Sequence, residues 1–218
     1  FGVFNPAIVL PAMAEGRKVS VDDILAARAK GAIAGLTRIL DGVPDGIGRA
    51  TDLLRRAADA CTCEGHALYA GLRSLGFPGD AMGDFWRSAD LVREHRGDSH
   101  IIAWTSHDVD AIEVTLLTEL WWRLPLKAYV GTRGWTPEEI DAAVGRLIER
   151  GLIEGEGFTE KGEALRASIE EATDRQERRV VEALGADADE LLDRLEPWSK
   201  AVVASGGYPS DPSSLTRP

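Results

Sequence analysis

Residues Thr136–Glu160 read TPEEIDAAVGRLIERGLIEGEGFTE, and they contain the clearest helix, turn and strand signals of the chain. Thr136 is expected to cap a helix that has Pro137 at its first position, and Glu139 completes a capping box. The apolar residues recur at helical spacing, which predicts a buried face made of Ile140, Val144, Leu147 and Ile148. The sequence therefore predicts a helix that begins after Thr136 and ends at Gly151.

A short hairpin is expected directly after this helix. Leu152–Glu154 has the composition of a strand, Gly155–Gly157 that of a tight turn, and Phe158–Thr159 that of the returning strand. Thr159 is also placed to cap a further helix that continues toward Val181. Short strands joined by a glycine turn predict a two-stranded antiparallel unit between two helices.

The residues before Thr136 extend this pattern. A regular apolar spacing predicts a helix and includes Val109, Ile112, Leu116, Leu117 and Leu120. Pro125 is expected to start a short helix that ends near residues 132–134. The order of helix, short helix, capped helix, hairpin and long helix is that of a winged helix, so we expect a winged-helix domain over residues 107–183.

The remainder of the chain is expected to be helical, which gives an all-α fold with one small β-hairpin. Residues 1–106 are expected to form a helical domain, in which Ser20 caps one helix and has Asp23 in its first turn. Residues 184–205 are expected to form a C-terminal helix that packs back, and residues 206–218 a mobile tail. Because the chain begins at Phe1 without methionine, we also expect that residues precede it.

Two resemblances support this division. Residues 135–165, with Leu147–Ile153 and Phe158–Gly162, resemble the DNA-reading half of multiple-antibiotic-resistance-regulator (MarR) type proteins. Residues 4–7, 93–100 and 133–136 together resemble an actinobacterial helix-turn-helix family of no settled function. The second resemblance implies an all-helical N-terminal domain joined to a winged helix, and it implies no catalytic mechanism.

The charge of the chain bears on its partners. The chain has 36 acidic and 25 basic residues, a formal net charge of −11. The predicted outer face of helix 137–150 carries Glu138, Asp141 and Glu149, and acidic side chains there repel phosphate. Contacts with DNA would have to come from three arginines: Arg133, Arg146 and Arg150. The alternative is that the winged helix serves as a packing or dimerisation unit.

A cluster of cations and histidines indicates a ligand site in the helical domain. If residues 93–107 are helical, Arg93, Arg96, His100 and His107 share one face. Two arginines beside histidines suit a small anionic or aromatic-acid ligand, because guanidinium groups pair with carboxylates. The expected ligand-binding residues are Asn5, Arg93, Glu94, His95, Arg96, Asp98 and His100. Two simpler interpretations remain: an ion-pair network for the cluster, and a helix cap for Asn5.

The sequence has few signals of other chemistry. No two histidines in this region have the i, i+4 spacing of a helical zinc site, and Cys61 and Cys63 suit a reduced pair, so we expect no metal. Nucleophile elbows and phosphate-binding glycine loops are missing from the sequence, no cofactor is expected, and whether the protein is an enzyme is left open. The chain has no apolar run long enough to cross a bilayer.

The sequence therefore predicts a cytoplasmic, homodimeric, ligand-responsive transcriptional regulator, with DNA as a candidate partner and no membrane. The first alternative is an enzyme or small-molecule-binding protein in which the acidic winged helix is structural. The second alternative is an interaction scaffold.

Overall fold

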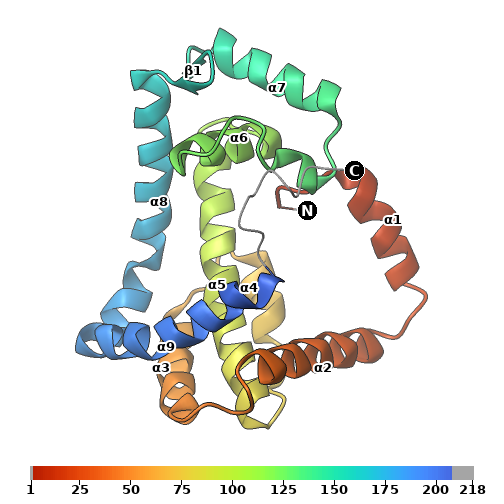
Figure 1. Cartoon of the computed structure of the whole chain (residues 1–218), viewed down its shortest axis with the longest axis vertical. Coiled ribbons are helices and arrows are strands. Elements are labelled where there is room, and N and C mark those ends of the chain that lie inside the picture. Colours follow the sequence, from red (N-terminus) through yellow and green to blue (C-terminus); the bar gives the residue numbers. More distant parts are fainter. Residues whose placement is uncertain (1, 208–218) are drawn as a thin grey trace. The chain divides into compact units, whose positions relative to one another are not determined.

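The computed structural model of the chain describes residues 2–207 and confirms the all-α prediction (Figure 1). Within these residues, a two-stranded antiparallel sheet accompanies the helices and pairs Ile153 with Phe158. The elements, in chain order, are α1 (Pro6–Gly16), α2 (Val21–Ile39), α3 (Ile47–Ala60), α4 (Ala67–Arg73), α5 (Ala81–Thr105), α6 (Ala111–Trp121), η1 (Val130–Arg133), α7 (Pro137–Glu149), β1 (Ile153–Glu154), β2 (Gly157–Phe158), α8 (Glu160–Leu184), η2 (Gly185–Asp187), α9 (Ala188–Val202) and η3 (Val203–Gly207).

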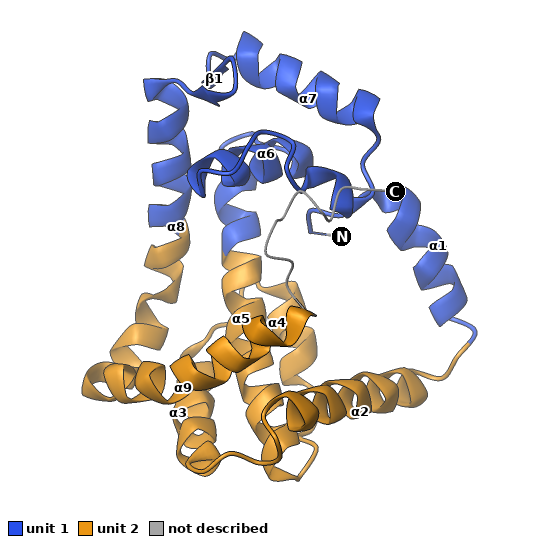
Figure 2. Cartoon of the chain, viewed as in Figure 1, with its two compact units in different colours: residues 1–18, 100–172, 209–218 blue, residues 19–99, 173–208 orange. Residues whose placement is uncertain are grey.

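The chain divides into two compact units, each described here by itself (Figure 2). Unit 1 comprises residues 1–18, 100–172 and 209–218, and unit 2 comprises residues 19–99 and 173–208. The boundaries between these units differ from the domain boundaries expected near residues 106 and 183. The reason is that α5 and α8 each contribute residues to both units. The tail expected to be mobile lies, from residue 208 onward, outside the described residues.

The predicted helix caps are confirmed. The Ser20 hydroxyl accepts the Asp23 amide, and Thr136 and Glu139 form the reciprocal capping box at the start of α7. The Asn5 side chain accepts the Ala7 amide at 2.8 Å and so caps α1. Each cap depends on residues within three positions of one another, which is why the sequence alone could locate it.

The helix expected to begin at Pro125 does not form, and only residues 130–133 are helical, as a single 3-10 turn. The cause is Glu119 at the end of α6, whose carboxylate is fully buried. It accepts three backbone N–H groups at 2.6–2.8 Å, from Lys127, Tyr129 and Val130. Burial raises the pKa of Glu119, and these backbone donors oppose that rise. The carboxylate thus holds this loop in a non-helical path.

The core of unit 1 lies between α6, α7, the hairpin and the first turns of α8. On α7 the buried residues are Ile140, Ala143 and Leu147. Val144 is half-buried and Ile148 is 50% exposed, so the prediction that Ile148 is buried was wrong. The residue after Leu147 is turned by about 100° around the helix, away from the core. Trp122 is 64% exposed, so it does not lie in the core of the chain.

The core of unit 2 joins α3, α5 and α9. Its buried apolar residues include Leu53, Leu54, Met82, Phe85 and Leu191. A smaller cluster of Ala58, Tyr69 and Leu91 lies between α3, α4 and α5. In the described part of the chain, none of the helices combines the length and hydropathy needed to cross a membrane.

Candidate functional site

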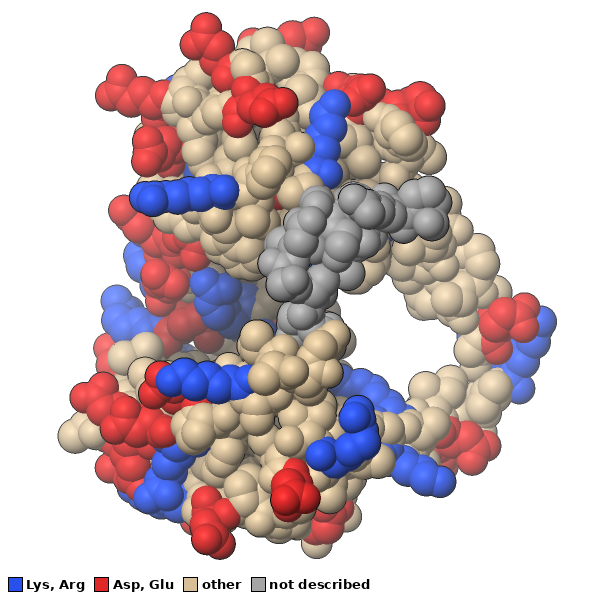
Figure 3. Space-filling view, in the orientation of Figure 1, with Lys and Arg blue, Asp and Glu red and all other residues tan. Residues whose placement is uncertain are grey.

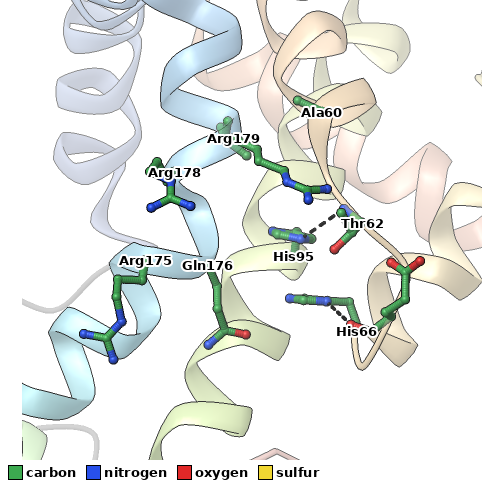
Figure 4. Close-up of a pocket in the computed structure, with 10 residues that line it drawn as sticks. Ala60, Thr62, His66, His95, Arg175, Gln176, Arg178 and Arg179 are labelled. Carbon is green, nitrogen blue, oxygen red and sulfur yellow. Dashed lines mark hydrogen bonds between the residues drawn. The ribbon is translucent and has the colours of Figure 1, made fainter.

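A pocket of about 450 Å³ in unit 2 is the candidate site (Figure 4). It is lined by the end of α3, the segment that leads into α4, the middle of α5 and the C-terminal half of α8. Its lining residues are Ala60, Thr62, Glu64, His66, His95, Arg175, Gln176, Arg178, Arg179 and Val180. Two histidines therefore share one pocket with three arginines.

The two histidines are stacked and almost completely buried. The rings of His66 and His95 lie parallel, with centroids 4.0 Å apart and an interplanar angle of 7° (Figure 4). His66 Nδ1 lies 2.8 Å from the Glu64 carbonyl oxygen, which can only accept, so this nitrogen carries a proton. The Thr62 amide donates to His95 Nε2 at 3.4 Å, which leaves the proton of a neutral His95 on Nδ1.

Glu177 of α8 links the two histidines through Ser99 of α5. One carboxylate oxygen lies 2.6 Å from the Ser99 hydroxyl and 2.9 Å from His95 Nδ1, and the other lies 3.0 Å from the same nitrogen. The same hydroxyl lies 2.9 Å from His66 Nε2. Ser99 is fully buried and Glu177 is only 9% exposed, so the cluster forms a continuous hydrogen-bonded chain away from water.

Asp98 fixes the segment that carries His66. One oxygen of its buried carboxylate accepts the backbone amides of Leu68 and Tyr69 at 2.9 and 3.0 Å, in the first turn of α4. Tyr69 packs edge-on against His95, with ring centroids 5.2 Å apart, and donates its hydroxyl to the Ala58 carbonyl at 2.7 Å. Tyr69 thus packs against the imidazole of His95 on one side, while His66 stacks on it.

The arginines give the open side of the pocket a positive charge. Arg175, Arg178 and Arg179 are exposed residues of α8, and Arg178 pairs with Glu182 at 3.5 Å. Guanidinium groups beside a partly buried cavity can hold a carboxylate or phosphate by paired hydrogen bonds. The arrangement can therefore bind an anion against a wall that contains the histidine pair.

Cys61 and Cys63 flank the lining residue Thr62. Burial, reinforced by the charge of Glu177, raises the pKa of the Cys61 thiol to about 12. At neutral pH this group is therefore a thiol, which makes it a poor nucleophile and a poor metal ligand. Cys63 is exposed, and both cysteines are free in the structure.

Of the expected ligand-binding residues, only His95 lines this pocket. The face of α5 that is buried carries His95, Asp98 and Ser99, whereas Arg93 and Arg96 are exposed. Arg93 pairs with Glu94, and a nitrogen of Arg96 lies 4.0 Å from Asp174. His107 lies beyond the end of α5, so the expected four-residue stripe is not one helix face.

Asn5 and His100 belong to unit 1, apart from the other expected ligand residues. Asn5 is buried, and its amide group donates to the Gly134 carbonyl and to Glu139, each at 3.1 Å. It caps α1 and ties that helix to the start of α7, which is a structural role. The sequence interpretation of Asn5 as a helix cap is thereby confirmed.

The sequence analysis missed His66, Ser99, Glu177 and the arginines of α8. One signal was available for Glu177. The buried positions of α8 recur at helical spacing through Ile169, Thr173 and Val180, and Glu177 is an acid on that same face. A carboxylate on the buried face of a helix requires a polar partner.

The comparison with family models identifies the chain. The matching model is described as a helix-turn-helix family, and it covers residues 1–209. The chain belongs to this helix-turn-helix family. The comparisons with curated proteins and with solved structures found no match.

In DNA-binding helix-turn-helix proteins the second helix of the motif enters the major groove, and α7 is the counterpart here. Its exposed residues include Glu138, Asp141 and Glu149. Figure 3 shows acidic side chains spread over the α7 and hairpin end of unit 1. For this member of the helix-turn-helix family, the charge of α7 is unfavourable for contact with phosphate.

The three arginines expected at DNA are engaged within unit 1. Arg146 and Arg150 both bind the buried carboxylate of Glu113, at 3.0 and 2.9 Å. The guanidinium group of Arg133 lies over the rings of Phe4 and Tyr129. The helix-turn-helix region of this family member therefore uses these cations as internal contacts.

Proposed function

We propose that this chain is a ligand-responsive regulator of the helix-turn-helix family, in which unit 2 binds a small anionic molecule. The observation that carries the proposal is the pocket that places Arg175, Arg178 and Arg179 beside the buried His95. In a chain with a net charge of −11, a cavity lined by three arginines is a local exception. Carboxylate and phosphate are the groups that arginines bind best.

The output of the proposed regulator is the region from α6 to α8. The order of α6, η1, α7, β1, β2 and α8 supports a winged-helix interpretation of residues 107–183. The helix α8 follows the hairpin and also carries the arginines of the pocket. A single helix is thus shared by the proposed ligand site and the proposed output.

Anion binding is tested by titrating the full chain with inorganic phosphate and with benzoate, in chelator, by calorimetry. We expect a saturable site that is weakened at least about tenfold by Arg178→Met with Arg179→Met, since tenfold corresponds to the loss of about 1.4 kcal/mol of binding free energy. The matched control is Lys30→Met with Arg38→Met on α2, which removes the same charge outside the lining residues of the pocket.

Equal weakening by the two double variants would attribute binding to overall charge, and a wild-type chain that binds neither anion would remove the ligand site from the proposal. Thermal unfolding of each variant, recorded by circular dichroism, separates loss of the site from loss of the fold.

DNA binding by the output region is tested by retention of mixed genomic fragments at increasing salt. Because α7 is acidic, few phosphate contacts can form, and we expect DNA binding to be weak. DNA should be retained at about 50 mM salt and no longer retained at about 200 mM salt. Failure to retain DNA even at the lower salt, with a dimer present, would contradict the regulator interpretation. This result would not contradict the proposed anion site.

A second candidate function is favoured by the ion pairs of Arg146 and Arg150. In it, the protein is an enzyme or small-molecule-binding protein, and the region from α6 to α8 is structural. The DNA experiment distinguishes the two candidates. A homodimer and a cytoplasmic location remain predictions, and the 64% exposure of Trp122 supplies one apolar surface for a partner subunit.

A further inference from the structure

We infer that His66, His95 and Glu177 form a binding site for one divalent transition-metal ion. The three residues come from three separate elements: the residue before α4, the middle of α5 and the C-terminal half of α8. One potential ligand atom from each lies within 4.8 Å of the other two. This inference departs from the expectation of no metal, and it does not require the anion site to exist.

The donor set indicates the class of metal. Two imidazole nitrogens and one carboxylate oxygen are typical ligands of zinc and of the neighbouring first-row metals, whereas calcium and magnesium prefer oxygen alone. Three protein ligands leave at least one coordination position open. The cavity beside His66 and His95 gives that position access to a water molecule or to an anion.

The surroundings of His66 and Glu177 are those of metal ligands. A metal-binding histidine usually donates its other ring proton to a carbonyl or carboxylate, and His66 donates Nδ1–H to the Glu64 carbonyl at 2.8 Å. This bond leaves His66 Nε2 directed at the cluster. Ser99 donates its hydroxyl proton to the Glu177 carboxylate at 2.6 Å and holds its orientation.

The carboxylate of Glu177 is only 9% exposed, and a buried carboxylate is costly unless a positive charge lies beside it. A metal ion held by His66, His95 and Glu177 would supply that charge.

Coordination requires one rearrangement. The stacked rings of His66 and His95 are parallel, so their lone pairs cannot both point at one ion. If the His95 ring turns about its Cβ–Cγ bond, the two rings are no longer parallel and a nitrogen of each can point at the same ion. The turn breaks the weak 3.4 Å hydrogen bond from the Thr62 amide. Metal binding is thus expected to separate the stacked pair.

The test uses the full chain without an affinity tag, stripped with chelator and titrated with Zn²⁺ by calorimetry. We expect one equivalent of Zn²⁺ to bind at a single site. With Co²⁺, the absorption spectrum should show ligand-field bands without a thiolate charge-transfer band. Multiple weak sites, or no binding, in the wild-type chain would overturn the proposal whether or not any variant folds.

The variants identify the ligands. His66→Ala, His95→Ala and Glu177→Gln should each weaken Zn²⁺ binding by more than about 100-fold, beyond the 10- to 100-fold typical of outer partners, and Ser99→Ala by about tenfold. His107→Ala and the double change Cys61→Ser with Cys63→Ser are the matched controls and should leave binding unchanged. The assignment would be overturned if a folded Glu177→Gln chain bound Zn²⁺ with wild-type affinity. It would also be overturned if the cysteine double variant lost Zn²⁺ binding.

The metal proposal and the anion proposal are tested by separate experiments, so either one can be contradicted without the other. Phosphate titration in chelator tests the arginines without metal, whereas Zn²⁺ titration without phosphate tests the histidines and Glu177. A chain that binds Zn²⁺ and no anion supports the metal site alone.

Discussion

Replacing Gly162 with alanine is expected to lower the free energy of unfolding by about 3 kcal/mol, the upper end of the usual cost of overpacking. Gly162 lies in the first turn of α8, where its amide donates to the capping hydroxyl of Thr159 at 3.0 Å. A Cβ atom at this position would lie 1.8 Å from the carbonyl oxygen of Leu152. This obstacle is backbone, so no side-chain rotation can relieve it.

The backbone around Leu152 has little freedom to move. Its amide donates to Leu147 at the end of α7, and its carbonyl accepts the Thr159 amide at 3.1 Å. Leu152 itself is buried in the core of unit 1. Alanine at position 162 would therefore push the hairpin away from α8 and open that core.

Gly145→Ala is the matched control for this prediction. Gly145 lies in the middle of α7, and a Cβ atom there would meet nothing within 4 Å. Because alanine has the higher helix propensity, this change should stabilise the protein by roughly 0.5–1 kcal/mol. Urea denaturation followed by circular dichroism measures both. Similar midpoints for the two variants would show that the hairpin does not pack against α8 as described.

The fold of unit 1 could be predicted from sequence where its signals are local. Thr136, Glu139 and Thr159 cap helices through neighbours three positions away, and the glycine turn of the hairpin needs no distant partner. The sequence shows a threonine-x-x-glycine pattern at the start of α8, but it does not show why glycine is required there. The carbonyl that excludes a side chain at Gly162 belongs to Leu152, on the other side of the hairpin.

The loop after α6 could not be predicted from the same signals. Pro125 is a common first residue of a helix, and no residue pattern indicated that Glu119 would accept the amides of this segment. An acid near the end of an apolar helix usually faces water. Only the folded chain shows that this carboxylate turns inward.

The candidate site was predictable in part for a related reason. Helical periodicity groups Arg93 with Arg96, and with equal regularity it groups His95 with Ser99, so it cannot say which face of α5 is buried. Glu177 decides the question, because it meets His95 and Ser99 from a position about 80 residues later in the chain. A pairing over that separation is set by packing and not by sequence pattern.

Removing Arg146 and Arg150 together is expected to destabilise the protein by about 3–5 kcal/mol, the cost of leaving a buried charge without its partner. Both guanidinium groups bind the carboxylate of Glu113, whose side chain is 4% exposed. Arg146 also pairs with Asp110, and Arg150 donates to the carbonyl of Asp108 at 2.9 Å. The double variant Arg146→Ala, Arg150→Ala would leave Glu113 with one backbone donor at 3.2 Å, the Asp110 amide.

Two comparisons make this prediction specific, both measured by urea denaturation. Lys127→Ala breaks an exposed ion pair with Asp141 and should cost less than about 1 kcal/mol. Adding Glu113→Leu to the double arginine variant removes the buried charge as well, and it should restore most of the lost stability. Failure of Glu113→Leu to restore stability would mean that the arginines act through contacts other than this carboxylate.

The restored triple variant also addresses the output of the proposed regulator. It lacks Arg146 of α7 and Arg150, which caps that helix, but it should be folded, so its retention on mixed genomic fragments isolates the contribution of these arginines to DNA binding. Because these guanidinium groups are engaged with Glu113, we expect retention to match the wild-type chain within about twofold at each salt concentration. A loss of tenfold or more, with a shallower salt dependence, would assign Arg146 and Arg150 to phosphate contacts. That result would favour the DNA-binding interpretation of α7 in spite of its acidic face.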